Sequence, residues 1–356
     1  MGRIPYTPQE DADAVVDGIP DVRVWSDDTV AIAAAIRRGV GTSVNPGTKP
    51  SLLALSGGGS EGAYGAGFLT CWTQTGTRPQ FSIVTGASVG GLIAPFAFLG
   101  SAYDPYIEQM FTSGETDGLL QFAGLPGLFG SGLFREEPLR RLVDHYVTRS
   151  LLDAIAAQYR RGRRLMVVTT DLDNQRTALW DMGRIASSQA PQALDLFRSV
   201  LLASAAIPGV FPPEEIPVES GGRDYSEMHV DGGVTANVLA IPEGMLTSSL
   251  TTAPSVHPDL YIIIDGKIVP DFELAKTGVV DIVTRSFETT LKANTLNGLI
   301  ATAEYAKRQG WALHTTSIAG DIHSTSPTDF SAPQMRNLFA AGCNTALSPK
   351  RWSEND

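Results

Sequence analysis

The sequence has few of the features that directly identify a metal, redox or membrane protein. Its 356 residues include only two cysteines, Cys71 and Cys343, which fit neither a zinc-site spacing nor a redox C-x-x-C pair. The longest apolar run, residues 92–99, contains Pro95 and falls far short of the roughly 18 apolar residues that a transmembrane helix needs. These absences exclude the common cysteine motifs and predict no membrane span. They leave the cellular compartment open.

Positive charge is also scarce. Lys and Arg total 27 against 38 Asp and Glu, so the formal net charge is −11. The basic run from Arg160 to Arg164 is interrupted by Gly162. It is typical of a solvated turn, with a weak contact to a phospholipid head group as the alternative. The sequence therefore predicts no nucleic-acid partner and no strong electrostatic capture by anionic membranes, and it leaves peripheral membrane contact open.

The beginning of the chain lacks the charged and then apolar pattern of a secretory leader. The first 25 residues are rich in Pro, Asp and Gly, which predicts a surface arm, and Asp27 or Asp28 can cap a short helix after it. We expect a soluble or peripheral chain. It is either exported, with a leader missing from this sequence, or cytoplasmic, and the sequence does not indicate its oligomeric state.

Short apolar runs alternate with helical stretches through most of the chain. The runs predict buried parallel strands at 52–55, 81–84, 165–168, 228–230 and 260–264. The helices are predicted at 63–71, 89–99, 138–148, 151–159 and 191–205. A helix at 279–307 with a break near Asn297 and Gly298, a strand at 311–318 and a helix at 333–347 complete the pattern. The alternation predicts an α/β fold, with a parallel sheet covered by helices on both faces.

A glycine-rich loop follows the first of these strands. Gly57, Gly59 and Gly62 satisfy the dinucleotide pattern G-x-G-x-x-G. A dinucleotide site also needs an acidic residue about 20 positions later, and no Asp or Glu occurs between Gly62 and Tyr103. A phosphate-binding Walker loop is excluded as well, because the turn has no Lys followed by Ser or Thr.

A second glycine motif, Gly86-Ala87-Ser88-Val89-Gly90, joins a predicted strand to a predicted helix. The pattern G-x-S-x-G in this position is typical of a nucleophilic serine on a sharp turn, where Gly86 and Gly90 leave room for the backbone. The alternative is that Ser88 only caps the helix. Turns that follow neighbouring parallel strands meet at one sheet edge, so the backbone N–H groups of Gly57, Gly58 and Gly59 can serve as oxyanion donors for Ser88.

A base must accept the serine proton. Asp231-Gly232-Gly233 follows an apolar strand and predicts a carboxylate at the same sheet edge, although a turn Asp that bonds its own backbone is the commoner role of such a pair. The histidines, namely His145, His229, His257, His314 and His323, stand in no motif. A triad that adds His257 or His314 to Ser88 and Asp231 therefore stays an alternative.

Taken together, four motifs resemble the patatin-like phospholipase family. They are Ser56-Gly57-Gly58-Gly59 with Gly62 and Gly65, the Ser88 motif, the run ASAAIPGVFPP at 203–213, and Asp231-Gly232-Gly233. The resemblance covers about residues 49–346. It implies a three-layer α/β/α fold with a mainly parallel sheet and no metal or organic cofactor.

The resemblance also implies an enzyme: a lipid acyl hydrolase of the phospholipase A, lysophospholipase or esterase type. In it Ser88 attacks a lipid or small acyl ester, Asp231 is the base, and Gly57, Gly58 and Gly59 form the oxyanion hole. The resemblance divides the chain into three parts: an N-terminal arm and short helix at 1–47, a catalytic domain at 48–346 and a C-terminal tail at 347–356.

Two positions depart from the family pattern. Glu61 stands where the family usually has Arg or Lys, and Ser56 where it commonly has Asp. A carboxylate that pointed inward would oppose the oxyanion. We expect Glu61 to point away. A catalytically weak acyl-binding or interaction module with the same fold is the alternative function.

Two further features have uncertain roles in the sequence. The apolar, glycine-rich stretch at 118–134 suits an acyl-chain channel or a lid, and a buried crossover segment is the equal alternative. Asp171, Asp173 and Asp181 are spaced loosely for a divalent metal site, and the sequence favours solvated loop carboxylates instead.

Overall fold

The structure is a computed structural model of the whole chain. It describes residues 3–353 apart from 17, 41–48, 124–131, 248–256, 273, 276, 321 and 323–325, and it describes only the backbone of 36–40 and 279–281.

Among the described residues, one ten-stranded sheet forms the centre of the molecule, in the order β1-β7-β8-β5-β4-β3-β9-β10, with β6 beside β5 and β2 beside β6. The parallel part consists of β5 (Arg164–Asp171), β4 (Ile83–Ala87), β3 (Ser51–Leu55), β9 (Asp259–Ile264) and β10 (Ala312–Ser317). The antiparallel additions are β1 (Val15–Val16), β2 (Arg23–Trp25), β6 (Arg176–Asp181), β7 (Glu214–Ser220) and β8 (Arg223–Asp231).

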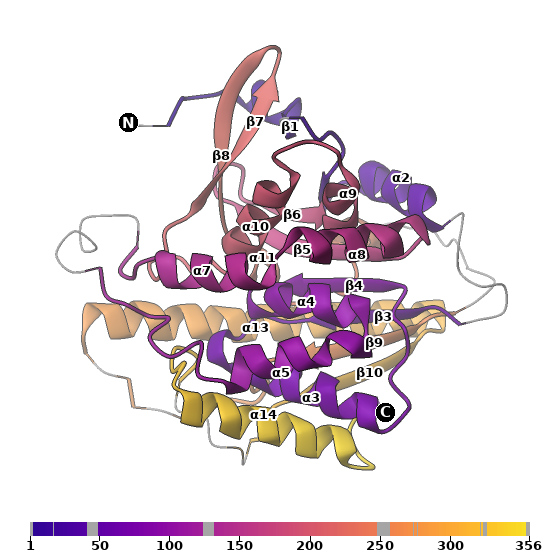
Figure 1. The fold of residues 1–356 in the computed structure, drawn as a ribbon, viewed down its shortest axis with the longest axis vertical. Helices are drawn as coiled ribbons and strands as arrows, with labels where there is room; N and C mark the ends of the chain where they lie inside the picture. The colour runs from indigo at the N-terminus through magenta and orange to yellow at the C-terminus, as the bar shows by residue number, and fades with distance from the viewer. Residues whose placement is uncertain are drawn as a thin grey trace.

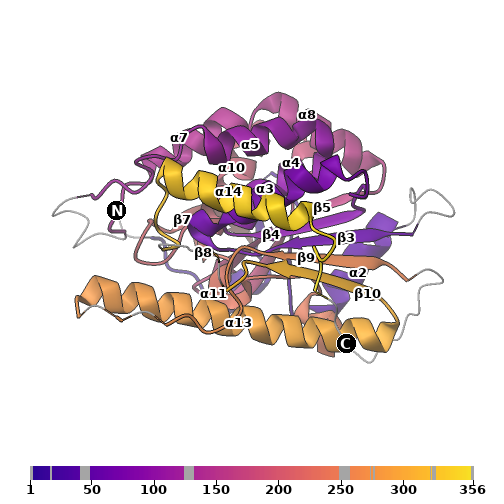
Figure 2. The ribbon, with the colours of Figure 1, turned by 90° about the horizontal axis from the view of Figure 1, so that it is seen from below.

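Helices cover both faces of the sheet, as Figure 2 shows with α13 on one side and α3, α4, α5 and α14 on the other. The longer helices are α2 (Thr29–Val40), α3 (Gly62–Gln74), α4 (Val89–Leu99), α5 (Asp104–Thr112), α7 (Glu137–Tyr146), α8 (Arg149–Arg160), α10 (Ala193–Ser204), α13 (Val279–Gln309) and α14 (Ala332–Leu347). The short ones are α1 (Pro8–Ala12), η1 (Gly59–Glu61), η2 (Ser101–Tyr103), α9 (Met182–Ser187), α11 (Gly233–Ala236) and α12 (Glu243–Thr247). The predicted three-layer α/β/α class with a mainly parallel sheet is confirmed.

The central strands are apolar because both of their faces are covered. Leu53, Val84, Leu165 and Ile262 are at most 1% exposed. Strands buried on both faces have nearly continuous apolar sequences, and this is why the predicted strands at 52–55, 165–168 and 260–264 are confirmed. The strand predicted at 81–84 is displaced, because β4 covers Ile83–Ala87.

The prediction of a short parallel strand at 228–230 is wrong. β8 runs over Arg223–Asp231, lies antiparallel to β5, and forms a hairpin with β7 that extends away from the helical layers (Figure 1). Gly221 and Gly222 both have positive φ at the turn, as a two-residue hairpin of type I′ requires. β7 alternates buried and exposed residues, so a search for continuous apolar runs does not find it.

Two other predictions need correction. The first 25 residues are not a separate surface arm, because β1 pairs with β7 and β2 pairs with β6, and Val22 between them is buried. α13 is continuous through Asn297 and Gly298, since a glycine inside a long helix costs only about 1 kcal/mol. It ends instead at Gly310, whose φ of 67° is typical of a helix C-cap. The cap of α2 is Asp28, which accepts from the N–H groups of Val30 and Ala31.

Cys71 and Cys343 form a disulfide that joins α3 to α14. The sequence spacing did not suggest this pairing, because the two residues meet only through tertiary packing. A native disulfide typically stabilises a fold by about 2–4 kcal/mol and is typical of proteins that mature in an oxidising compartment. Within the described residues, no helix is both long enough and apolar enough to cross a bilayer.

Candidate active site

The glycine loop after β3 is held by hydrogen bonds from three sides. The Ser56 hydroxyl donates to the carbonyl of Gly57 at 2.8 Å and accepts from the N–H of Asp265 at 2.8 Å. The N–H of Gly57 donates to the carbonyl of Asn237 at 2.9 Å, and the Asp265 carboxyl accepts from the N–H of Gly65 at 2.8 Å. The loop is therefore fixed, and the Gly57 donor is already in use.

Gly58 and Gly59 have N–H groups with no acceptor among the described residues. A Cβ at Gly58 would lie 1.8 Å from the backbone oxygen of Asp265, and one at Gly59 would lie 2.2 Å from that of Pro327. Gly59 also has a φ of 58°. Only glycine fits these two positions, and the Gly58 and Gly59 N–H groups, unlike that of Gly57, are not already bonded to a described residue.

Ser88 lies on a sharp turn between β4 and α4. Its φ of 53° and ψ of −129° are rare for a residue with a side chain. A Cβ at Gly86 would lie 2.3 Å from the backbone oxygen of Gly90, so the turn needs glycine there. The N–H of Ser88 donates to the hydroxyl of Ser204 at 3.0 Å, and the Ser88 side chain makes no helix-capping hydrogen bond. The geometry supports a nucleophile turn over the capping alternative.

Asp231 lies at the end of β8 and is 2% exposed. Its Oδ1 accepts from the N–H of Gly233 at 2.7 Å, and its own N–H donates to the carbonyl of Ala206 at 3.0 Å. Burial raises the pKa of Asp231 to about 7, against the opposing effect of the Ser88 hydroxyl and the Gly233 N–H. A Cβ at Gly232 would lie 2.6 Å from the backbone oxygen of Val168, so the turn after Asp231 also needs glycine.

The sheet itself brings Ser88 and Asp231 together. One edge of β5 pairs with β6, and its other edge pairs first with β4 through residue 168 and then with β8 from residue 169. Asp231 is opposite Thr169, and Ala87, the residue before Ser88, is opposite Val168. A Cβ at Gly57 would lie only 2.8 Å from the Cβ of Ser88. Three turns from different strands therefore converge on Ser88.

The described histidines do not join this site. His229 is fully buried in a separate cluster, and His314 lies 3.8 Å from Asp259 at the opposite end of the sheet. His257 lies beside Gly310, and the ring of His145 packs against that of Tyr146. His323 is outside the described residues. The geometry gives no support to a triad with His257 or His314.

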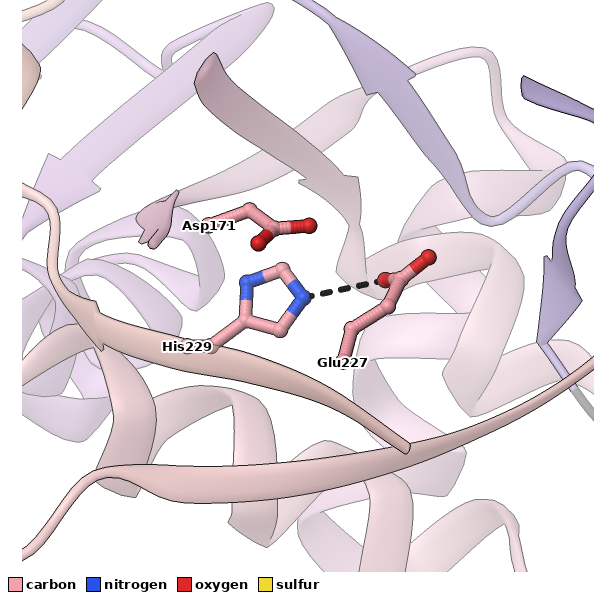
Figure 3. A group of neighbouring side chains, drawn as sticks. All are labelled: Asp171, Glu227 and His229. Atoms are coloured by element: carbon pink, nitrogen blue, oxygen red, sulfur yellow. Dashed lines mark hydrogen bonds and ion pairs between the residues drawn. The ribbon is translucent and has the colours of Figure 1, made fainter. Parts of the chain in front are cut away.

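A second group of ionisable residues is buried on β5 and β8 (Figure 3). His229 Nε2 lies 3.1 Å from a Glu227 carboxylate oxygen, and its Nδ1 lies 3.0 Å from the Thr169 hydroxyl. One ligand atom each from Asp171, Glu227 and His229 lie within 4.8 Å of one another, a spacing that could hold a metal ion. Arg23 already forms an ion pair with Glu227, so we assign the group to the stability of the hairpin base.

The three acidic residues considered in the sequence do not converge. Asp173 pairs with Arg3 and Tyr6, while Asp181 accepts from the N–H of Arg184 at the start of α9. Asp171 alone belongs to the buried cluster, where burial raises its pKa to about 6. The preference for solvated loop carboxylates is wrong for Asp171, which is fully buried.

Glu61 lies toward the end of β9. A Cβ at Gly266 would be 3.5 Å from a carboxylate oxygen of Glu61. Burial raises the pKa of Asp265 well above its usual range, and the charge of Glu61 adds to that rise. Glu61 is not among the groups that shift the pKa of Asp231. This placement supports a carboxylate that points away from Ser88.

The apolar stretch at 118–134 is described only at its two ends. The N–H of Ala123 donates to Leu133, while the N–H groups of Leu133 and Phe134 donate to Gly209 and Val210. Phe122 is 55% exposed. The second end of the stretch is thus bonded to the segment that leads to β7. Ala206, which precedes this segment, accepts a hydrogen bond from the N–H of Asp231. Residues 124–131, on which the lid prediction depends, lie outside the described residues.

Sequence patterns did not identify Ser204, Asn237 or Asp265. Ser204 bridges the N–H of Ser88 and the carbonyl of Val168, and Asp265 supports the glycine loop. Asn237 contacts the same loop through its carbonyl. The signal that could have indicated Asn237 is a single amide in the apolar stretch after Gly233. Ser204 lies in the run at 203–213, whose motif indicated no role for the serine, and Asp265 follows strand β9 without a motif.

Comparison with known proteins identifies one family. A family model described as patatin-like phospholipase matches residues 53–242, which include the Ser88 and Asp231 motifs. No curated protein sequence matches the chain.

Solved structures of similar arrangement include VipD from Legionella pneumophila, at 13% identity and a TM-score of 0.38, over 85% of this chain and 70% of that one. They also include full-length ExoU from the type III secretion system of Pseudomonas aeruginosa, solved with SpcU, at 14% identity and a TM-score of 0.31. That match covers 84% of this chain, which spans about half (53%) of ExoU.

Proposed function

The chain belongs to the patatin-like phospholipase family, and we propose that it is a serine hydrolase of lipid acyl esters that uses Ser88 and Asp231. The observation that carries the proposal is the convergence of two strand ends on β5. One presents Ser88 on a rare backbone conformation, and the other presents a buried Asp231. A nucleophile beside a base with a pKa near 7 is suited to acyl transfer at neutral pH.

In the first half of the reaction, the Ser88 oxygen attacks the ester carbonyl and Asp231 accepts the hydroxyl proton. The carbonyl oxygen becomes an oxyanion, and we assign its donors to the N–H groups of Gly58 and Gly59. Gly57 then has a different role from the one expected, because its N–H anchors the loop to Asn237. The ester C–O bond breaks, and the leaving alcohol takes the proton from Asp231.

In the second half, water attacks the acyl group on Ser88. Asp231 accepts one proton of the water, the bond between the carbonyl carbon and Ser88 breaks, and the serine oxygen takes the proton back. The products are a carboxylic acid and free enzyme. The chain's own residues suffice for each of these transfers.

Apolar side chains next to the turns favour a lipid acyl chain. The side chain of Val89 on α4 packs closely against Gly62, and the side chain of Leu291 on α13 packs closely against Gly233. Phospholipid, lysophospholipid and simple esters share this acyl chemistry, and a peripheral contact with a lipid surface belongs to the same proposal. The acyl-binding alternative rests on Glu61, and the position of its carboxylate beside Gly266 supports the hydrolase instead.

The test compares wild type with Ser88→Ala and Asp231→Asn. Hydrolysis of p-nitrophenyl butyrate and of phosphatidylcholine vesicles, with labelling by a fluorophosphonate probe, should be lost in Ser88→Ala and strongly reduced in Asp231→Asn. His257→Ala and His314→Ala are the matched controls and should keep wild-type rates. Unchanged hydrolysis in either dyad variant would contradict the proposal. A wild-type protein that retains fatty acid without any turnover would favour the binding module.

A further inference from the structure

Asn237 has a buried carbonyl oxygen that no described residue satisfies. The residue follows α11 and is 6% exposed. Its amide nitrogen donates to the hydroxyl of Thr295 on α13 at 2.8 Å, and that hydroxyl donates in turn to the carbonyl of Leu291. This chain of donors fixes the orientation of the amide. Oδ1 therefore faces the other way, and it has no hydrogen-bond partner among the described residues.

The unsatisfied oxygen lies between the glycine loop, the nucleophile and the base. A Cβ at Gly57 would be 2.4 Å from Asn237 Oδ1 and 2.8 Å from the Cβ of Ser88. A Cβ at Gly233 would be 3.0 Å from Asn237 Oδ1 and 3.0 Å from Asp231 Oδ1. The carbonyl of Asn237 also anchors the N–H of Gly57. Oδ1 thus points into the proposed active site.

A buried carbonyl without a donor costs stability, so its retention in an ordered site calls for an explanation. The proposed reaction contains one step that needs such an acceptor. When water attacks the acyl-serine, Asp231 takes one of its two protons and the other O–H bond is still directed at the protein. A neutral acceptor can hold that second O–H without adding a negative charge near the oxyanion.

We propose that Asn237 is a catalytic residue for deacylation, in which Oδ1 accepts a hydrogen bond from the attacking water and orients it toward the acyl carbon. The inference rests on the proposed function. Asn237 neither gains nor loses a proton in this step. One water proton passes to Asp231 and then to Ser88, and the other stays in the acid product. Acylation needs no such contact, because the serine hydroxyl has only one proton.

Methanol separates this role from a structural one. Methanol also attacks the acyl-serine and gives its only hydroxyl proton to Asp231, so it has no second O–H for Asn237 to hold. The experiment measures the ratio of methyl butyrate to butyric acid formed from p-nitrophenyl butyrate in aqueous methanol. In Asn237→Leu the ratio should rise about tenfold, the effect of one lost hydrogen bond in the transition state of hydrolysis alone. The rate of fluorophosphonate labelling, which needs no water, should stay within about twofold of wild type.

Three variants act as controls. Asn294→Leu makes the same substitution on the neighbouring α13, where the amide nitrogen donates to the carbonyl of Val234, and should keep the wild-type ratio. Asn237→Gln keeps a neutral acceptor oxygen and should restore the ratio toward wild type. Asn237→Ala repeats the test if Asn237→Leu does not fold.

Two results would overturn the inference. The first is an unchanged product ratio in an Asn237→Leu protein that is still labelled at Ser88. The second is an equal loss of hydrolysis and methanolysis, which would indicate a structural role. Failure of the proposed function is recognised separately, because wild type itself would then neither react with the probe nor turn over the ester.

Discussion

Strand β8 carries two buried carboxylates whose surroundings differ sharply. Burial would raise the pKa of Glu227, but His229 and Arg23 outweigh it, so the pKa of Glu227 is lowered. Burial also acts on Asp231, and the neutral Ser88 hydroxyl and Gly233 N–H oppose it only in part, so its pKa rises to about 7. The same strand therefore holds one carboxylate as a fixed anion and leaves the other able to exchange a proton.

The difference assigns Glu227 to the stability of the fold and Asp231 to the proposed chemistry. An ion pair such as Arg23 with Glu227 is costly to break once buried, because the remaining charge has no partner. A carboxylate near neutral donors can lose its charge without that penalty, and a pKa close to the working pH is what a general base needs.

The largest expected effect is on activity. Asp231→Asn should lower kcat by about 10³-fold, because the amide cannot accept the serine proton. Its free energy of unfolding should stay the same or rise, since the variant removes a buried ionisable group that lacks a charged partner. Ester hydrolysis and urea unfolding measure the two quantities. A large loss of stability in Asp231→Asn would contradict the assignment of this residue to chemistry.

Glu227→Gln should show the opposite pattern. It leaves Arg23 buried without its partner, and we expect the free energy of unfolding to fall by about 3 kcal/mol while kcat of the folded protein changes less than about threefold. The control is Asp27→Asn, which removes an exposed ion pair with Arg176 and should cost less than about 1 kcal/mol. Equal destabilisation by the two variants would contradict the larger contribution that we expect from the buried ion pair.

The pH dependence distinguishes the two carboxylates further. kcat/KM should fall about tenfold per pH unit below pH 7, because Asp231 must be ionised to act as a base. Because the folded pKa of Asp231 is above its usual value, its contribution to stability is present at acidic pH and is lost as the pH rises through about 7.

The contribution of Glu227 to stability has the reverse pH dependence, because its pKa is lowered on folding. Glu227 stabilises the fold at pH values above its usual pKa, and this stabilisation is lost as the pH falls through its lowered pKa. Urea unfolding of Glu227→Gln and Asp231→Asn across this range measures both contributions. A pH profile of kcat/KM without an inflection near neutrality would contradict the role of Asp231.

The smallest expected effect concerns Glu61. Glu61→Gln should change kcat less than tenfold, because the carboxylate of Glu61 lies toward Gly266. It therefore acts on the oxyanion only through its long-range electrostatic field. Initial rates on p-nitrophenyl butyrate measure this. A gain well beyond tenfold would mean that Glu61 opposes the oxyanion directly.

The sequence was sufficient for features with a local physical signature. Ser88 is recognisable because a nucleophile turn needs glycine at 86 and 90, and the structure shows the close contact that explains this need. Asp231 is recognisable as a carboxylate at a strand end followed by two glycines. The buried parallel strands are apolar throughout, and they were predicted for that reason.

The remaining features depend on distant parts of the chain. Gly57 looked equivalent to Gly58 and Gly59, and only the contact with Asn237 distinguishes it. β7 is half exposed, so its alternating pattern is weak, and β8 reaches β5 only through the hairpin. Cys71 meets Cys343 because α3 packs on α14. None of these contacts follows from spacing in the sequence.

We propose Ser88 as the nucleophile and Asp231 as its base. The most direct measurement is the rate at which a fluorophosphonate probe labels Ser88 in wild type and in Asp231→Asn, followed by mass spectrometry between about pH 5 and 9. We expect one label per chain on Ser88, a wild-type rate that rises with pH and levels off above about 7, and a slow rate without this inflection in Asp231→Asn. An unlabelled Ser88, or equal rates in the two proteins, would contradict it.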